Sequence, residues 1–135
     1  MSAPLDLTQE FIDRADNGEV GETLVSETDE LRVWHIHAKL GERLKVHTHV
    51  LDYFWTIHGP GMARNHQPDG TYFDVEYQTG DTKHSRFEVG ERMSHSLENV
   101  GDTDLIFTTV EFKNSANDPL PIALNADGST QSVSR

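Results

Sequence analysis

The sequence predicts an all-β fold made of two antiparallel sheets, and three observations lead to this prediction. From residue 23 onward the chain consists of short runs rich in β-branched and aromatic residues, the side chains that fit a pleated strand. The breaks between these runs, such as LGE, HGPG, QPDG and TGD, each contain a glycine that can adopt a positive φ in a turn. The runs number eight or nine, and their close spacing is typical of an antiparallel sandwich or barrel.

One short helix is expected before the strands, in the segment TQEFIDRA at residues 8–15, with Thr8 or Asp6 as its N-cap. The polar tail that begins at Asn125 is expected to fray. The strands are expected at residues 23–27, 30–38, 43–49, 52–58, 61–66, 71–78, 82–89, 92–98 and 104–113.

The length and this order of elements predict a single domain. The 135 residues are enough for one hydrophobic core but not for two. We expect an N-terminal arm at residues 1–29, a barrel at residues 30–113, and a partly disordered C-terminal extension at residues 114–135.

Composition and charge exclude several classes of function. The net charge of −12 repels a phosphate backbone, so we expect no nucleic-acid partner. No apolar run approaches the roughly 20 residues of a membrane-spanning helix, and the first residues lack the basic and apolar regions of a signal peptide. We therefore expect a cytoplasmic protein without a membrane partner. The absence of cysteine excludes disulfides and thiolate metal sites.

The sequence holds eight histidines, including two His-x-His pairs, His35/His37 and His47/His49. Residues i and i+2 of a strand point to the same face, so either pair can present two imidazoles side by side to a metal ion. In RVWHIHA the first pair alternates with Trp34 and Ile36. If these apolar residues are core, the first pair faces outward; otherwise it lines a pocket and supports the ligands.

The context of the second pair resembles the first motif of the cupin superfamily, G-x5-H-x-H-x3,4-E-x6-G. The segment GERLKVHTHVLDYFWTIHG, residues 41–59, matches the motif at both histidines and at its first and last glycines. The glutamate position of the family falls on Asp52 when it is counted back from Gly59. The stretch HTHVLDY is also similar to small bacterial cupins that are described as β-alanine degradation proteins.

A looser resemblance to the second cupin motif, G-x5-P-x-G-x2-H-x3-N, covers residues 80–99. Gly80, Gly90, His95 and Asn99 are present, but the proline is absent and the spacings to His95 are longer. Together the two motifs imply a double-stranded β-helix, the cupin jelly-roll barrel. The family also commonly forms homodimers, so we expect a homodimer in which residues 1–30 take part.

The resemblance implies one divalent metal ion per chain, held by His47, His49, Asp52 and His95. Iron is favoured, and manganese, nickel or zinc also fit nitrogen and oxygen ligands. Strand alternation counted from His49 places Tyr53 inward, whereas the count from Gly59 places Asp52 inward, and we favour the second count. If the short Asp52 side chain does not reach the metal, the site resembles the three-histidine cupins that cleave β-diketones or oxidise thiols.

Other polar residues have less certain roles. His58 precedes GPG and is a candidate general acid–base at the barrel mouth, and Tyr53 is a candidate catalytic residue in the pocket. Asn99 is expected to hold a turn, and Glu111 to face solvent between two buried neighbours. His66 and His84, beside turns, are expected to be solvated.

The resemblance implies a metal-dependent enzyme that acts on a small polar organic molecule. The favoured function is that of an Fe(II)-type dioxygenase or related oxidoreductase. A redox-neutral isomerase, cyclase or lyase with zinc, manganese or nickel is the alternative within the enzymes. A cupin that binds a metabolite without catalysis is the alternative outside them.

Overall fold

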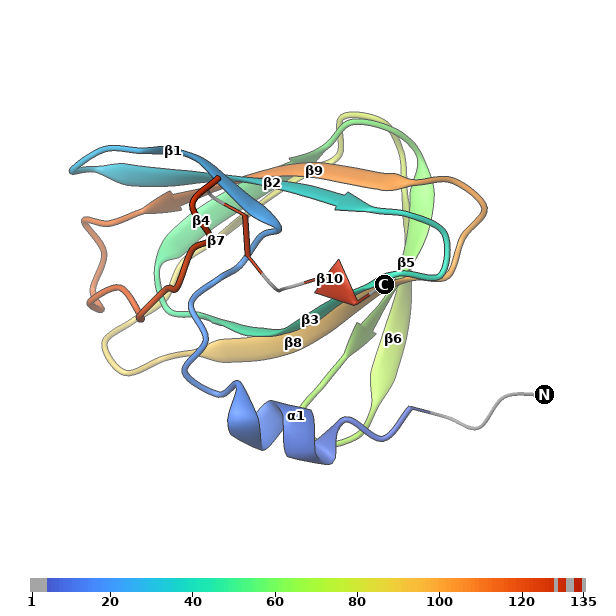
Figure 1. The fold of residues 1–135 in the computed structure, drawn as a ribbon, viewed down its shortest axis with the longest axis horizontal. Coiled ribbons are helices and arrows are strands. Elements are labelled where there is room, and N and C mark those ends of the chain that lie inside the picture. Colours follow the sequence, from blue (N-terminus) through green and yellow to red (C-terminus); the bar gives the residue numbers. More distant parts are fainter. Residues whose placement is uncertain (1–4, 128, 131–132, 135) are drawn as a thin grey trace.

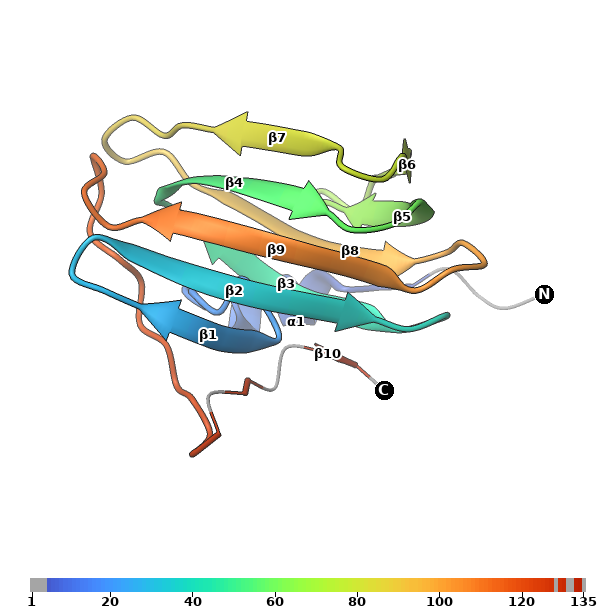
Figure 2. The ribbon, with the colours of Figure 1, turned by 90° about the horizontal axis from the view of Figure 1, so that it is seen from above.

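The computed structural model describes residues 5–127 and 129–130, together with the backbone of residues 133–134. Two five-stranded antiparallel sheets face each other, with a short helix against the outside of one of them (Figures 1 and 2). This confirms the predicted all-β fold with two sheets. The elements are α1 (Thr8–Asp13), β1 (Thr23–Glu27), β2 (Leu31–Ala38), β3 (Arg43–His49), β4 (Asp52–Ile57), β5 (Gly61–His66), β6 (Tyr72–Tyr77), β7 (Thr82–Ser85), β8 (Met93–Asn99), β9 (Leu105–Phe112) and β10 (Val133–Ser134).

The strand order places the two ends of the chain in different sheets. One sheet has the order β1-β2-β9-β4-β7 and the other has the order β10-β3-β8-β5-β6. The strand β1 pairs with β2, so the first sheet already begins within the segment predicted as an arm. Residues 1–4, 128, 131–132 and 135 of the predicted arm and extension lie outside the described residues. Among the residues that are described, no helix is long and apolar enough to cross a membrane.

Glycines close four of the predicted turns in the expected way. Gly41, Gly70, Gly80 and Gly90 have φ values of 79°, 86°, 87° and 84°. No described residue other than glycine has a positive φ, which agrees with the low steric cost of this conformation for glycine alone. Each of these glycines lies in or beside the break between two strands. The predicted strands agree with the observed ones to within one residue at each end, except that β7 ends at Ser85 instead of at the predicted residue 89.

The core lies between the two sheets and follows the period of two along each strand. In β2 the residues Trp34, Ile36 and Ala38 are buried, and their cross-strand partners in β9 are Thr109, Phe107 and Leu105. Burial of side chains of this size contributes about 1.5–3 kcal/mol each. This core confirms that His35 and His37 alternate away from it. The central cluster consists of Ile36, Ala38, Leu44, Ile57, Ala63, Tyr77, Leu97, Leu105 and Phe107.

Asn99 closes the loop between β8 and β9, as predicted. Its amide Nδ2 donates to the carbonyl oxygens of Ala38 at 3.0 Å and Thr103 at 2.8 Å. Its Oδ1 accepts the N–H of Gly101 at 3.0 Å. The side chain therefore satisfies backbone groups that the loop would otherwise leave buried without partners.

Glu111 is buried, and the prediction that it faces solvent is wrong. Its side chain continues the inward face of Leu105, Phe107 and Thr109, so the alternation in β9 is offset by one residue from the expected one. The indole Nε1 of Trp34 donates to Glu111 Oε1 at 2.7 Å. Burial raises the pKa of the Glu111 carboxyl to about 7, although the indole donor opposes this rise.

Glu111→Gln is expected to remove one pH-dependent part of the folding free energy. The pKa of the carboxyl is about 7 in the folded state and about 4.3 in an unfolded chain. The folded state therefore loses stability relative to the unfolded chain as pH rises through this window. Gln retains an acceptor for Trp34. The stability of Glu111→Gln relative to the unsubstituted chain should grow by up to about 3 kcal/mol between the two ends of the window. Urea denaturation of both proteins in chelator measures this, and a constant difference would contradict it.

Candidate metal centre

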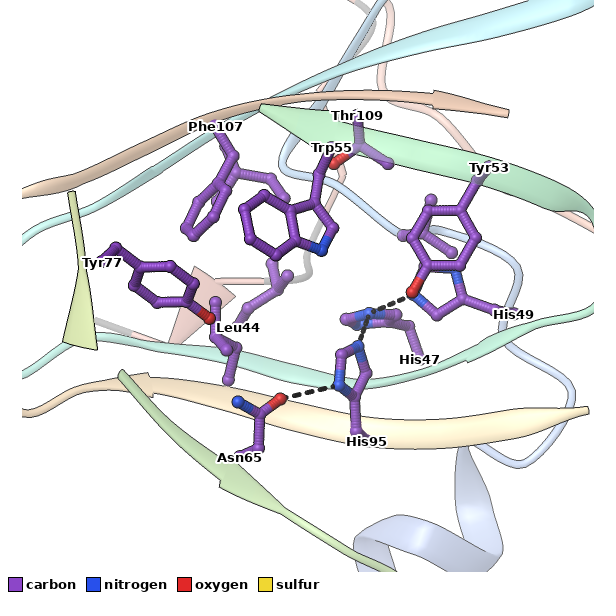
Figure 3. Close-up of a pocket in the computed structure, with 13 residues that line it drawn as sticks. Leu44, His47, His49, Tyr53, Trp55, Asn65, Tyr77, His95, Phe107 and Thr109 are labelled. Atoms are coloured by element: carbon purple, nitrogen blue, oxygen red, sulfur yellow. Dashed lines mark hydrogen bonds between the residues drawn. The ribbon is translucent and has the colours of Figure 1, made fainter. Parts of the chain in front are cut away.

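Three imidazoles converge at the inner surface of the sheet that contains β3 and β8 (Figure 3). His47 and His49 share the inward face of β3, and His95 on β8 is the cross-strand partner of His47. The Nε2 atom of His47 lies 3.1 Å from that of His49 and 2.8 Å from that of His95. The ligand atoms of all three lie within 4.8 Å of one another.

The local structure of β3 explains how both of its histidines come to face inward. The pairing of β3 with β8 shifts register between Leu44 and His47, and such a bulge re-aims the side chains that follow it. Thr48 points to the opposite face, where its hydroxyl donates to Ala15 O at 2.7 Å. Its N–H donates to Asn17 O at 2.8 Å. The chain that follows α1 therefore covers the outer face of β3.

Contacts of the other ring nitrogen, Nδ1, orient two of the three rings. His47 Nδ1 lies 3.2 Å from the carbonyl oxygen of Lys45. His95 Nδ1 lies 3.0 Å from Asn65 Oδ1, and the other end of the Asn65 side chain bonds to the hydroxyl of Tyr77. Both ring contacts are with acceptors, so each Nδ1 carries the proton and each Nε2 is bare. A metal-binding histidine uses the same arrangement.

The donor set fits a divalent ion of the first transition row. Two bare Nε2 atoms at 2.8 Å cannot bond to each other, and a cation between them satisfies both lone pairs. Two ligands at about 2.1 Å from one ion and at a right angle to each other are about 3.0 Å apart, close to the separations observed here. The fit concerns neutral nitrogen donors only, because the group contains no carboxylate among the described residues.

The surroundings keep the three rings neutral. Burial lowers the pKa values of His47 and His49 well below the ordinary value, and the neighbouring histidines lower them further. Burial also lowers the pKa of His95 to about 4, with a smaller contribution from the positive charge of Lys83. A metal ion requires deprotonated imidazole nitrogens, so no proton has to be removed from these rings near neutral pH.

His49 is held by stacking instead of by a hydrogen bond. Its ring lies 4.0 Å from the ring of Tyr53, centroid to centroid, with 13° between the planes. Its Nδ1 is buried without a partner among the described residues. Tyr53 is 4% exposed, and burial raises the pKa of its hydroxyl to about 12. Tyr53 therefore faces the site and retains its proton.

The preferred count that placed Asp52 inward is wrong. Asp52 Oδ1 accepts the backbone N–H of Phe87 at 2.9 Å, and Asp52 is not part of the histidine group. The connection at Val50 and Leu51 preserves the alternation of β3, so odd-numbered residues stay inward and Tyr53 occupies the position beside His49. The site that the structure offers is therefore a three-histidine site.

The remaining predicted histidines lie outside this group. His58 is exposed, and its Nε2 lies 2.7 Å from Thr108 Oγ1 on the outer face of the sheet, so it is not placed as an acid–base in the pocket. His37 lies outward, 2.8 Å from Asp104 Oδ2. His66 is buried against Glu98 Oε1 at 2.8 Å, which corrects its expected exposure. His84 is exposed beside Phe54.

A cavity of about 60 Å³ lies beside the three imidazoles. Beyond Tyr53 and His95 it meets a groove of about 600 Å³, because the two share five lining residues. Trp55 lies two residues after Tyr53 on the same strand and therefore on the same face, so this spacing could have identified Trp55 in the sequence. No sequence pattern identifies Asn65. The cavity is lined by Val20, Ile36, Leu44, Tyr53, Trp55, Asn65, Tyr77, Leu97, Phe107 and Thr109, in addition to the histidines.

Solved structures resemble this arrangement of strands. A cupin domain from Bordetella pertussis Tohama I has a TM-score of 0.59 and 21% identity, over 68% of this chain and 91% of that one. The chain has the cupin fold. An uncharacterised protein with a double-stranded β-helix domain from Klebsiella pneumoniae has a TM-score of 0.55 and 26% identity, over 87% of this chain and 95% of that one. For an RmlC-like cupin from Methanocaldococcus jannaschii the values are 0.52 and 18%, over 67% and 77%.

The sequence comparisons add no family below this level. No family model matches this chain, and no curated protein is significantly similar to it. The structural likeness confirms the resemblance to cupins that the two motifs indicate. It does not extend to a reaction, because fold alone does not determine function. The likeness to β-alanine degradation proteins stays a prediction.

Replacement of individual histidines should separate ligands from bystanders. We expect His47→Ala and His95→Ala each to lower metal content from about one ion per chain to near zero, because two imidazoles hold first-row ions weakly. His35→Ala should retain the metal, since His35 lies on the other face of its strand. Asp52→Asn should retain it as well. Elemental analysis after purification measures the metal content, and full metal occupancy in His47→Ala would contradict the assignment of His47 as a ligand.

Two substitutions of Tyr53 should distinguish its ring from its hydroxyl. Tyr53→Phe retains the stacked ring and should leave metal affinity within about twofold, whereas Tyr53→Leu removes the support of His49 and should weaken it at least about tenfold. Competition with a chelating dye measures both affinities. Equal affinities for the two variants would show that stacking does not orient His49.

Proposed function

We propose that this cupin is a metal-dependent enzyme of the dioxygenase type, which holds one divalent ion through His47, His49 and His95. The observation that carries the proposal is the convergence of bare Nε2 atoms at the inner end of a small, largely apolar cavity. Three protein ligands leave coordination positions open for a substrate. The size of the cavity supports a small organic molecule as that substrate.

The residues of the chain have separate tasks in this proposal. Asn65 holds the Nδ1 proton of His95 and so keeps the Nε2 lone pair of that ring directed at the site. The Tyr53 hydroxyl retains its proton, and Tyr53 lines the cavity beside His49, so this group would serve as a donor to a molecule bound there. Trp55, Leu97 and Phe107 line the rest of the cavity and exclude water from it.

The metal supplies the chemistry that the side chains lack. When bound, an iron ion would supply redox chemistry toward O2 and an organic substrate, whereas zinc, manganese or nickel would supply Lewis acidity. Iron is preferred because the all-histidine donor set resembles that of the three-histidine cupins that oxidise thiols or cleave β-diketones. The sequence also predicts a cytoplasmic homodimer, and both features remain part of the proposal.

One observation favours a redox-neutral reaction as the second candidate. The three donors are neutral, and no described carboxylate lies in the group to balance a divalent charge. A three-histidine zinc site of this kind polarises bound oxygen ligands strongly. An isomerase, cyclase or lyase could use the same residues without O2.

Elemental analysis and an oxygen electrode test the two candidates together. Protein purified without added metal should contain iron and should consume O2 with at least one member of a panel of small oxo acids, thiols and 1,3-diketones. Bound zinc, manganese or nickel with turnover in the absence of O2 would favour the redox-neutral reaction. No bound metal, together with unchanged thermal stability in chelator, would contradict both and indicate a cupin without catalysis.

A further inference from the structure

The groove outside the metal cavity contains a cation, Lys83, that forms no ion pair with any residue that the structure describes. Lys83 lies on the edge strand β7 and is the cross-strand partner of Trp55, so both residues share the inward face of their sheet. Lys83 lines the groove together with His95 and Tyr53, which also line the metal cavity. Its charge acts on the His95 ring. The ammonium group is therefore placed between solvent and the metal site.

Lys83 differs from five of the nine other Lys and Arg residues that the structure describes, because those five form ion pairs with carboxylates. No carboxylate of the described residues lies within ion-pair distance of Lys83. The chain has 23 acidic residues and 11 Lys and Arg residues, so a cation in a groove has many possible partners. Ion pairs with carboxylates are formed by Arg32, Arg43, Arg64, Arg92 and Lys113.

Two acidic residues also border the groove, but neither occupies the position of a partner for Lys83. Glu76 alternates with Val75 and Tyr77 on β6 and is exposed on the opposite face, in line with Met62. Asp81 lies in the turn before β7, where its Oδ2 accepts the N–H of Gln78 at 2.8 Å. Among the described residues that line the groove, Lys83 is the one Lys or Arg side chain.

The rest of the groove is suited to an apolar body. Phe73 and Val75 line it from β6, Met93 from β8, and Trp55 from β4. Ser85 adds a hydroxyl group, and among the described residues no arginine or helix N-terminus lines the groove. Phosphate groups are commonly held by such arginines or by clustered backbone N–H groups. A single ammonium beside apolar walls matches one carboxylate on an apolar chain.

We propose that the groove binds a small carboxylic acid, whose carboxylate pairs with Lys83 while its apolar part lies against Trp55, Val75 and Met93. The opposite end of such a molecule reaches His95 and the metal cavity. This inference rests on the proposed function for the reaction at that end, but it names the substrate class from the groove alone. The carboxylate is an anchor and takes no part in a covalent step.

Binding of 3-phenylpropionate and of its neutral amide to the metal-loaded protein tests this inference. Calorimetry should show that the acid binds about tenfold more tightly than the amide, because the ion pair is made only by the acid. Lys83→Met should abolish this preference, and Lys83→Arg should preserve most of it. Lys39→Met is the matched control, because Lys39 is exposed outside the groove and its loss changes the net charge equally.

The outcomes separate this inference from the proposed function. Equal binding of acid and amide, or a preference that survives in Lys83→Met, would overturn the inference, as would no detectable binding up to millimolar concentrations. Tighter binding of phenyl phosphate than of the acid would overturn the carboxylate assignment. The preference should persist in His47→Ala, which lacks the metal, since Lys83 does not depend on it. Failure of the metal or O2 experiments therefore leaves this result interpretable.

Discussion

The burial of β3 on both faces is the constraint on which the rest of the structure depends. Its inner face carries His47 and His49, and its outer face is covered by the chain around α1. Two hydrogen bonds of 2.6 and 2.8 Å join the Arg43 guanidinium to Glu10, which also accepts the N–H of Val46. Burial opposes ionisation of Glu10, but these donors lower its pKa overall. A partly buried, bidentate pair of this kind fixes geometry more than it adds stability.

The protein orients the three imidazole rings firmly, whereas these neutral rings bring no charge to the site. Two rings are oriented by Nδ1 contacts and the third by an aromatic face, so the protein determines where the lone pairs point before any ion arrives. Positive charge acts on the site from Lys83 in the groove and from Arg14, and not from the neutral ligands. Such a division allows the inner cavity to remain apolar while the opening selects by charge. The two regions meet at Tyr53 and His95, which line both.

Much of the fold could be predicted from local patterns, whereas the details of the site depended on register. The period of two and the turn glycines are properties of a few neighbouring residues, and they predicted the strands. The choice of His47, His49 and His95 as the converging histidines came from the resemblance to the two cupin motifs. The side that Asp52 faces depends on whether the connection after His49 changes the alternation, and the residues of that connection do not show this. The same one-residue ambiguity misplaced Glu111. The contact of His66 with Glu98 joins different strands, so no local pattern could reveal it.

Asn65 has a consequence for how the specificity of this protein could diverge. One small amide contacts both the ring that orients a ligand lone pair and the phenol of Tyr77 on the cavity wall. A substitution of Asn65 would disturb both the metal ligand and the cavity wall, so it could not change the substrate preference without also affecting metal binding. Phe73, on β6, borders the groove but not the cavity that contains the metal ligands. A change of substrate would therefore begin with substitutions in the groove, and the residues of the metal cavity would change last.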